Sequence, residues 1–445
     1  MTEPRELTIV QAAQGLRRGE LSAEKLTRSC LERIEAREPA LRAWVHVDAE
    51  GALAAAHQLD REAREQRWQG PLHGIPLAIK DIIDVAGMET RGGTDAFPMR
   101  KPEQDADAVE RLRKAGAILL GKTVTTPLAY LDPPPTRNPW NAAHTPGGSS
   151  SGSAVAVADR HCLAALGTQT GGSVLRPAAF NGIVGFKPTY MSIPMAGIIP
   201  AAWQFDTLGV LTRSVEDAQA LWHLLRWQRS VDWQPTRDKM PPAMVPKAPQ
   251  RVWRVRGYFQ TEAEPEATAA VDEICALMAR RGVEIVEGPL PESFHGIHDA
   301  HFAILSAEAA LFNAQAYRLQ SEKFPPKLAK LIEDGLAQPA VSYVAARRQR
   351  LLLQEEMGTL LAAVDGAVMP PALGPAPDDL SQTGSAAFNA PWSLCGVPAI
   401  SLPVRLASNG LPVGVQWIGQ EDQEERLLSH AAWLESLINF NRAPG

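Results

Sequence analysis

The sequence predicts a single large α/β domain, in which helices cover both faces of a central mixed, mainly parallel twisted β-sheet. Strand-like and helix-like segments alternate along all 445 residues, as they do in sheets built with crossover helices. With 45% apolar and 21% charged residues, the composition is that of a globular protein with a large core. The sequence has no internal repeat and no low-complexity tract, so we treat residues 1–445 as one domain.

Residues 1–66 are predicted as an N-terminal helical segment. Apolar residues recur there at three- and four-residue spacing, and Ser22 fits an N-cap. Residues 74–87 form an apolar run bounded by glycines, which indicates a buried strand and its exit. Residues 105–124 are typical of a helix that stops at Gly116 and is followed by a strand, as in a βαβ unit.

The alternation continues through the rest of the chain. Turn-forming residues indicate a loop at 138–153, and 215–230 has the spacing of an amphipathic helix. Prolines mark 232–250 as a Pro-rich surface connection. Residues 251–445 are expected to supply the second half of the sheet and its covering helices, with 299–363 mostly helical.

Charge and cysteine content narrow the class of protein. Lys and Arg number 44 against 50 Asp and Glu, and no basic stripe is present, so no nucleic-acid partner is expected. No signal-peptide pattern and no run of about 18 apolar residues occurs, so we expect a cytoplasmic protein without a membrane partner. The four cysteines lie far apart among apolar neighbours, which predicts reduced core thiols: Cys30, Cys162, Cys275 and Cys395.

The chain carries Gly-Gly-Ser twice, at 147–149 and at 171–173. In the second copy, Ser173 comes just after a predicted strand. Because glycines leave the backbone uncovered, the N–H groups of Thr170, Gly171, Gly172 and Ser173 could stabilise an oxyanion beside a serine nucleophile. The alternative is a plain turn.

A serine nucleophile needs a base, and Lys80 is the unusual candidate. It lies in the apolar stretch IPLAIKDII, and lysines are seldom buried without a reason. Neutrality near pH 7 requires its pKa to fall by roughly three units, about 4 kcal/mol, which burial can supply. The alternative is that Lys80 ends a strand in solvent and pairs with Asp81 or Asp84. The sequence alone places no histidine beside Ser173.

The first Gly-Gly-Ser motif supplies a third candidate, Ser149. It opens a loop with hydroxyls at Ser149, Ser150, Ser151 and Ser153. A Gly/Ser loop can be a flexible linker. It can instead be pressed against the sheet, with its hydroxyls turned inward, when a small-residue helix follows, as it does here.

These segments resemble the amidase signature family. The resemblance rests on GIPLAIKD, NPWNAAHTPGGSSSGSAVAVA, GTQTGGSVLRPAAFNGIVGFKPT and FNAPWSLCGVPAISLP, and it is densest over a signature core at 70–215. It implies a Ser-Ser-Lys triad in which Ser173 is the nucleophile, Lys80 the neutral base and Ser149 a middle serine that follows a cis peptide bond. The implied reaction is amide hydrolysis through an acyl-enzyme, without a cofactor.

The sequence departs from the family pattern in two places. The usual Asp is replaced by Gln169, and the arginine is displaced to Arg176, so we expect these two residues to support the nucleophile loop through a neutral hydrogen bond. Two loops lack the usual polar segments and are expected to wall the substrate site with apolar side chains. These are Leu128, Tyr130, Met195, Ile198, Ile199, Trp203 and Phe205. They favour small apolar or aryl amides, anilides or carbamates (urethanes), with ester hydrolysis also open.

Other sites are poorly supported. The spacing of His295, His298 and His301 puts them on different helix faces, so no metal site is expected. No phosphate-binding glycine motif occurs. Two other functions stay open: a glutaminase-type subunit of a glutamine-dependent tRNA amidotransferase, and a non-catalytic binding protein on the same fold. A homodimer is also compatible with the sequence.

Overall fold

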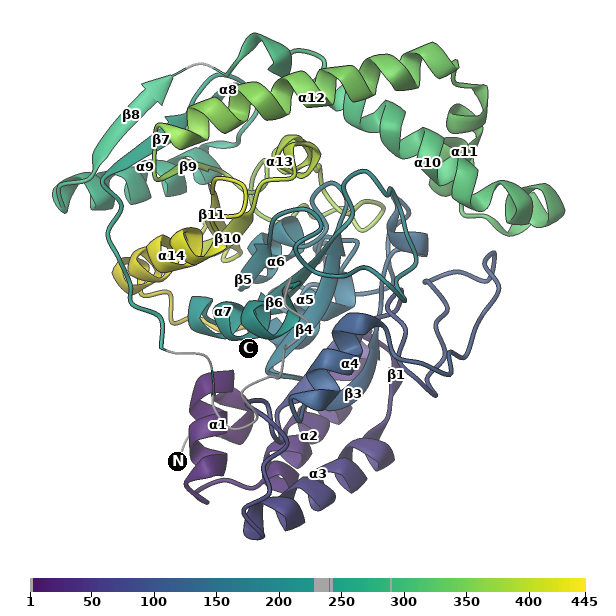
Figure 1. The fold of residues 1–445 in the computed structure, drawn as a ribbon, viewed down its shortest axis with the longest axis vertical. Helices are drawn as coiled ribbons and strands as arrows, with labels where there is room; N and C mark the ends of the chain where they lie inside the picture. The colour runs from purple at the N-terminus through teal and green to yellow at the C-terminus, as the bar shows by residue number, and fades with distance from the viewer. Residues whose placement is uncertain (1–2, 228–239, 241–242, 289) are drawn as a thin grey trace.

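A single twisted sheet runs through the whole protein. The computed structural model describes residues 3–227, 240, 243–288 and 290–445. Its eleven strands are ordered β1-β3-β2-β4-β6-β5-β10-β11-β9-β7-β8 (Figure 1). Their bounds are β1 (Trp44–Val47), β2 (Pro76–Lys80), β3 (Ile118–Thr123), β4 (Ala164–Gln169), β5 (Val184–Lys187), β6 (Thr207–Thr212), β7 (Arg251–Val255), β8 (Glu284–Gly288), β9 (Gly366–Met369), β10 (Ala399–Leu406) and β11 (Pro412–Ile418).

The single α/β domain with a mixed sheet is confirmed, but the expectation of a mainly parallel sheet is wrong. Only β2–β3, β2–β4, β7–β8 and β7–β9 pair in parallel among the described strands. The other six pairings are antiparallel. The cause is local: β5 and β6 pair directly, and β10 and β11 are joined by a short turn, so neighbouring strands reverse direction without a crossover helix.

Helices cover the sheet and add a separate layer at one margin. Helices α5 and α6 contact each other, as do α7 and α14, and each of the four also packs on sheet strands. Helices α10, α11 and α12 form the separate layer, green in Figure 1, and both α10 and α12 contact α13. The bounds are α1 (Ile9–Arg17), α2 (Ala23–Leu41), α3 (Ala49–Arg64), α4 (Asp107–Lys114), α5 (Ser151–Ala158), α6 (Leu175–Asn181), α7 (Val215–Leu225), α8 (Tyr258–Thr261), α9 (Pro265–Arg280), α10 (Ile297–Gln320), α11 (Pro326–Ala337), α12 (Ala340–Ala362), α13 (Ala390–Cys395) and α14 (Glu424–Ile438).

Most of the predicted elements are present. The Ser22 side chain caps α2 by accepting a hydrogen bond from Lys25 N. The N-terminal segment is not helical throughout, because β1 interrupts it and pairs with β3. Most of the Pro-rich connection at 232–250 lies outside the described residues; the part described, 240 and 243–250, contains no helix or strand.

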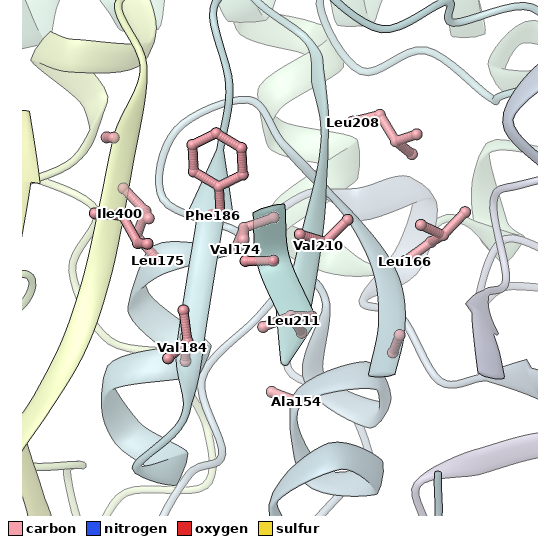
Figure 2. Packing of buried hydrophobic residues seen from close by; sticks show 14 of the residues in the cluster. Ala154, Leu166, Val174, Leu175, Val184, Phe186, Leu208, Val210, Leu211 and Ile400 are labelled. Atoms are coloured by element: carbon pink, nitrogen blue, oxygen red, sulfur yellow. The ribbon is translucent and has the colours of Figure 1, made fainter. Parts of the chain in front are cut away.

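The core is densest around the middle of the sheet. Strands β2, β3, β4, β5 and β6 are buried along their whole length. Figure 2 shows side chains of β4, β5 and β6 meeting those at the start of α6, with Leu166, Val174, Phe186 and Val210 among them. A sheet buried on both faces gives a rigid platform for the loops that leave β2 and β4.

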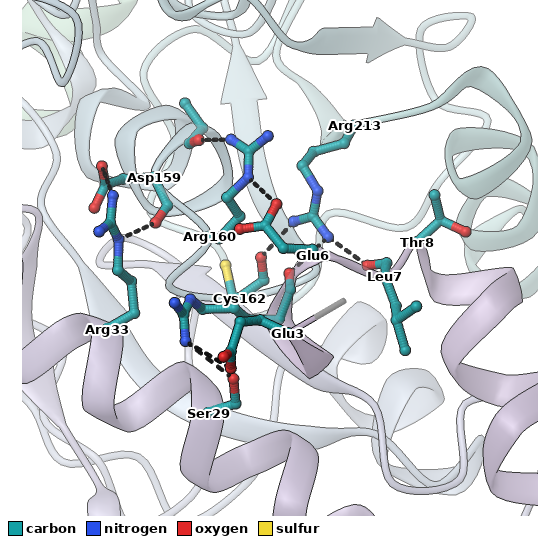
Figure 3. Close-up of polar contacts among 12 residues, drawn as sticks. Glu3, Glu6, Leu7, Thr8, Ser29, Arg33, Asp159, Arg160, Cys162 and Arg213 are labelled. Carbon is teal, nitrogen blue, oxygen red and sulfur yellow. Dashed lines mark hydrogen bonds and ion pairs between the residues drawn. The ribbon is translucent and has the colours of Figure 1, made fainter. Parts of the chain in front are cut away.

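A polar cluster fastens the N-terminal segment to the amino end of β4. The Arg213 guanidinium donates to Cys162 O at 3.0 Å and to the backbone carbonyls of Arg5 and Leu7 (Figure 3). Arg160 Nε donates to Glu6 Oε2 at 2.7 Å. This cluster lies at the opposite end of β4 from the candidate site. Among the described residues, no helix is long and apolar enough to cross a membrane.

Candidate active site

The candidate site lies where two parallel strands end side by side. Strand β2 pairs with β4 in parallel, with Leu77 opposite Ala164 and Ile79 opposite Leu166. The carboxyl ends of parallel neighbours meet at the same sheet edge. Lys80, the last residue of β2, therefore reaches the end of β4, where Thr168 leads into the second Gly-Gly-Ser motif.

Lys80 is completely buried and faces hydroxyls. Its Nζ lies 2.7 Å from Ser149 Oγ and 2.8 Å from Thr168 Oγ1. Within the described part of the chain, no carboxylate forms an ion pair with it. Burial lowers the pKa of Lys80 well below that of a free lysine, and the negative charge of Asp206 opposes this shift. The surroundings thus favour a neutral amine, which can accept a proton.

The alternative partners of Lys80 are engaged elsewhere. Asp81 Oδ1 lies 3.0 Å from Lys122 Nζ, and both side chains are fully buried. Asp84 forms an ion pair with Arg100 at 2.7 Å. Lys122 also donates to Thr90 Oγ1. The carboxylate next to Lys80 in sequence therefore has its own cation, and the reading of Lys80 as a solvent-exposed ion pair is wrong.

Ser149 is the only serine of its loop that faces Lys80. The Gly148–Ser149 peptide bond is cis. The Ser150 hydroxyl bonds the backbone of Thr168, and Ser151 Oγ donates to Val124 O. Ser153 Oγ donates to Leu166 O. Three of the four hydroxyls therefore hold the loop on the sheet, and the fourth reaches the amine.

Close packing explains the small residues that follow this loop. A Cβ on Gly152 would lie 2.1 Å from Ala43 O and 2.5 Å from Val124 N. A Cβ on Gly148 would lie 2.9 Å from Thr383 Cγ2. Side chains at these positions would push the loop off the sheet, so the Gly/Ser stretch is a pressed-in turn and not a linker.

The second motif leaves a row of unused backbone donors. The four carbonyls of Thr170–Ser173 all accept hydrogen bonds, in order from His301 Nε2, Ser393 Oγ, Arg176 N and Ser150 N. Over the described residues, no acceptor meets the N–H groups of the same four residues, and no hydrogen bond is formed by the Ser173 hydroxyl. Carbonyls held on one side and free N–H groups on the other are what an oxyanion hole requires.

The expected hydrogen bond between Gln169 and Arg176 is absent, so that prediction is wrong. Gln169 Oε1 accepts from Val174 N and Leu175 N, at 2.9 and 3.0 Å, and its amide donates to Ser393 Oγ. Arg176 lies one residue further along the chain than the arginine of the family pattern. Its guanidinium points to the first Gly-Gly-Ser motif. There it donates to Gly148 O at 2.7 Å and to Thr383 Oγ1 at 3.3 Å.

Several site residues were not anticipated. Asp206 Oδ1 accepts from Thr170 Oγ1 at 2.6 Å, while its Oδ2 accepts from Ala201 N and Ala202 N. Burial raises the pKa of Asp206 to about 6. His301 stacks on Phe205 with ring centroids 4.7 Å apart, and burial lowers its pKa to about 4. The signal for Asp206 was a single carboxylate within an apolar stretch, AAWQFDTLG.

The seven predicted wall residues differ in exposure. Leu128 and Phe205 are completely buried, and Tyr130, Ile198 and Ile199 are nearly so. Met195 is half-buried, and Trp203 is 44% exposed. The Trp203 ring meets Phe312 of α10 edge-on, and Phe312 stacks on Phe97. An aromatic cluster of Phe97, Trp203 and Phe312 therefore joins three segments, and Phe97 and Phe312 were not predicted.

The three clustered histidines lie in different surroundings. His301 faces Thr170, His298 packs at 5.2 Å from the Tyr258 ring, and the His295 side chain is 82% exposed. Over the described residues, no group of three or more His, Cys, Asp or Glu is placed to hold a metal ion. The four cysteines are free and buried, as predicted.

Comparison with known proteins finds relatives along almost the whole chain. A family model described as Amidase matches residues 25–428. A glutamyl-tRNA(Gln) amidotransferase subunit from Synechococcus sp. (strain WH7803) is 33% identical over 470 residues, covering 96% of both chains. A crystal structure of an amidase has a TM-score of 0.87 at 33% identity, covering 97% of this chain and all of that one. The structure of peptide amidase from Stenotrophomonas maltophilia has a TM-score of 0.84 at 30% identity, covering 99% of this chain and 98% of that one.

Proposed function

The chain belongs to the amidase family of hydrolases that act on carbon–nitrogen bonds, and we propose that it hydrolyses small apolar or aryl amides, anilides or carbamates. In this proposal Ser173 is the nucleophile, Ser149 the proton shuttle and Lys80 the base. The observation that carries it is the 2.7 Å contact between Lys80 Nζ and Ser149 Oγ, made by a lysine without an ion-pair partner among the described residues.

The proposed reaction forms an acyl-enzyme in its first half. Neutral Lys80 accepts the Ser149 proton while Ser149 accepts that of Ser173, and Ser173 Oγ attacks the carbonyl carbon. The free N–H groups of Thr170–Ser173 stabilise the oxyanion. Protonated Lys80 then returns its proton through Ser149 to the leaving nitrogen, the C–N bond breaks, and the amine departs.

The second half repeats the relay with water. Water loses a proton through Ser149 to Lys80 and attacks the acyl carbon of Ser173. The carboxylic acid leaves from an amide or anilide, and a carbonate half-ester leaves from a carbamate that has lost its amine in the first half. The Ser173 hydroxyl regains the proton, and the site returns to its starting state. The chain's own residues supply every proton transfer in this scheme.

The substrate class is inferred from the side chains around the nucleophile loop. Thr170 touches His301, whose ring is uncharged because burial lowers its pKa to about 4. Phe205 stacks on His301, and two residues before it Trp203 is 44% exposed and belongs to the aromatic cluster with Phe97 and Phe312. Aromatic faces bind aryl groups by stacking. This lining favours an apolar acyl or leaving group over a zwitterion such as glutamine.

One alternative is favoured by a specific observation. The relative from Synechococcus sp. is named as one component of a glutamyl-tRNA(Gln) amidotransferase, and it matches this chain over nearly its whole length. A glutaminase subunit of that kind would release ammonia from glutamine for a partner protein. It would need charged side chains to bind the α-amino and α-carboxyl groups of glutamine.

A substrate panel distinguishes the two functions. We would measure product release from benzamide, an aliphatic amide, a nitroanilide, an aryl carbamate and glutamine, each with the wild type and with Ser173→Ala. Turnover of aryl amides or carbamates that is lost in the variant supports the proposal. Turnover of glutamine alone would favour the amidotransferase component, and turnover that persists in Ser173→Ala would overturn the assigned nucleophile.

A further inference from the structure

Helix α12 presents a buried face and an exposed face, and the exposed face borders a groove with β7 and β8 at Leu352 and Glu355. Its inner face is buried and consists of Ala346, Arg350, Leu353, Met357 and Leu361. On the other side, Val341, Val344, Leu351 and Leu352 are exposed by 76, 64, 63 and 48%. At 100° per residue these four point away from the buried stripe. In Figure 1, α12 runs along the margin of the molecule.

Two opposite charges lie within this exposed stripe. Arg348 and Glu355 are exposed, and within the described part of the chain neither side chain forms a hydrogen bond or an ion pair. They are seven residues apart, too far for the i,i+4 pairing that stabilises a single helix. They share the face of the apolar residues, since 341, 348 and 355 repeat every seven residues. An apolar seam with unpaired charges of both signs is typical of a helix–helix contact surface.

The order of these residues is self-complementary. Arg348 stands three residues before Leu351, and Glu355 stands three residues after Leu352. A twofold axis perpendicular to the helix, midway between the two leucines, exchanges Arg348 with Glu355. It also sets Val344 opposite Thr359, and the small Ala345 opposite Gly358, where an added Cβ would meet nothing. Two copies of α12 placed antiparallel would therefore match leucine with leucine and positive with negative.

We propose that the exposed face of α12 binds the same face of a second copy of this chain, forming an antiparallel homodimer. Leu351 and Leu352 make its centre, and two Arg348–Glu355 pairs flank them. The contact is isologous, because each chain uses the same patch. A single helix pair covers less than the roughly 800 Å² per partner of a standard interface, so the dimer forms in a concentration-dependent way.

The test is the oligomeric state of the whole protein, measured by sedimentation velocity over a concentration series. The wild type should shift from one to two chain masses as concentration rises. Leu352→Glu should stay monomeric at the highest concentration. Leu319→Glu changes a leucine that is 78% exposed on α10, outside this face, and should dimerise like the wild type. Thermal unfolding checks that each variant is folded.

Charge exchange tests the antiparallel arrangement itself. Arg348→Glu and Glu355→Arg should each be monomeric, since each sets like charges against each other. An equimolar mixture of the two should form a heterodimer, and the double variant Arg348→Glu/Glu355→Arg should dimerise again. A wild type that is monomeric throughout overturns the proposal. So does a dimer that survives Leu352→Glu, or single charge variants that neither mixing nor combination restores.

Discussion

Lys80 Nζ lies 2.7 Å from Ser149 Oγ, although 69 residues separate them in the chain. Parallel pairing of β2 and β4 and the loop pressed on the sheet produce this contact. The contact allows proton transfer from Ser149 to Lys80 only if the amine is neutral, because a charged ammonium could donate a hydrogen bond but could not accept a proton. A lysine whose pKa is lowered by burial is able to take the Ser149 proton.

The first prediction concerns Lys80→Met. Turnover should be lost, because the base is gone. The unfolding temperature should rise, because the variant no longer has to bury or neutralise an ammonium group when it folds. The folded pKa of Lys80 is lowered, so the unfolded state binds more protons and wild-type stability increases with pH toward about 10.4. The stability gain of the variant should therefore shrink over that range. Urea unfolding from pH 7 to 10 measures it, and a gain that grows with pH would contradict the assignment.

The second prediction concerns the pH dependence of wild-type activity and Asp206→Asn. Activity should fall as pH decreases through the Lys80 pKa, since protonated lysine is no base. The Asp206 carboxylate raises that pKa, so its removal should move the acid limb of kcat/KM to lower pH. Thr170→Val removes a hydrogen bond that holds the Asp206 pKa down, so more of Asp206 is neutral near pH 6, and the limb should move in the same direction by a smaller amount. An acid limb that moves upward in Asp206→Asn would argue against this coupling.

The third prediction separates the serines by role. Ser173→Ala should abolish turnover, and Ser149→Ala should reduce kcat by about 10²–10⁴, the usual contribution of proton transfer. Ser151→Ala is the matched control, since among the described residues its hydroxyl donates to Val124 O and makes no other hydrogen bond. It should keep kcat within a few-fold of the wild type. Steady-state kinetics of the three variants would refute the roles if Ser149→Ala and Ser151→Ala behaved alike.

The three residues proposed as the triad stand out in the sequence because local motifs carry them. Lys80 interrupts an apolar run, and Ser149 and Ser173 each follow a glycine pair, so all three are visible without a structure. Asp206 could not be placed in the same way. It meets Thr170 only because β4 pairs antiparallel with β6, which sets Gln169 opposite Thr207.

The directions of the strands could not be predicted from the sequence for a related reason. Strands β1, β5 and β9 have only four residues, too few for a periodic signal to separate them from loops. The partner of Arg176 was also misassigned. Sequence neighbours suggested Gln169, but a shift of one residue along α6 turns the guanidinium toward Gly148 O.

The fourth prediction concerns Arg176→Met. Burial lowers the pKa of Arg176 to about 10, and within the described residues its Nε has no hydrogen-bond partner. Removing this charge offsets the loss of the bond to Gly148 O, so the unfolding temperature should change little. Turnover should fall roughly tenfold or more, because Gly148 precedes Ser149 and small displacements of catalytic groups are costly. Arg176→Lys should recover part of kcat. A variant with full activity would remove Arg176 from the positioning of Ser149.

The fifth prediction concerns the buried ion pair next to the base. Lys122→Met leaves the Asp81 carboxylate buried without its cation, which should lower the free energy of unfolding by about 3–5 kcal/mol. The double variant Lys122→Met/Asp81→Asn should regain part of this loss, as urea unfolding would measure. The single variant should also move the acid limb of kcat/KM to higher pH, since an unpaired carboxylate beside Lys80 favours its ammonium form. If stability fell while the acid limb stayed in place, Lys122 would serve the fold alone, and the neutrality of Lys80 would not depend on how Asp81 is paired.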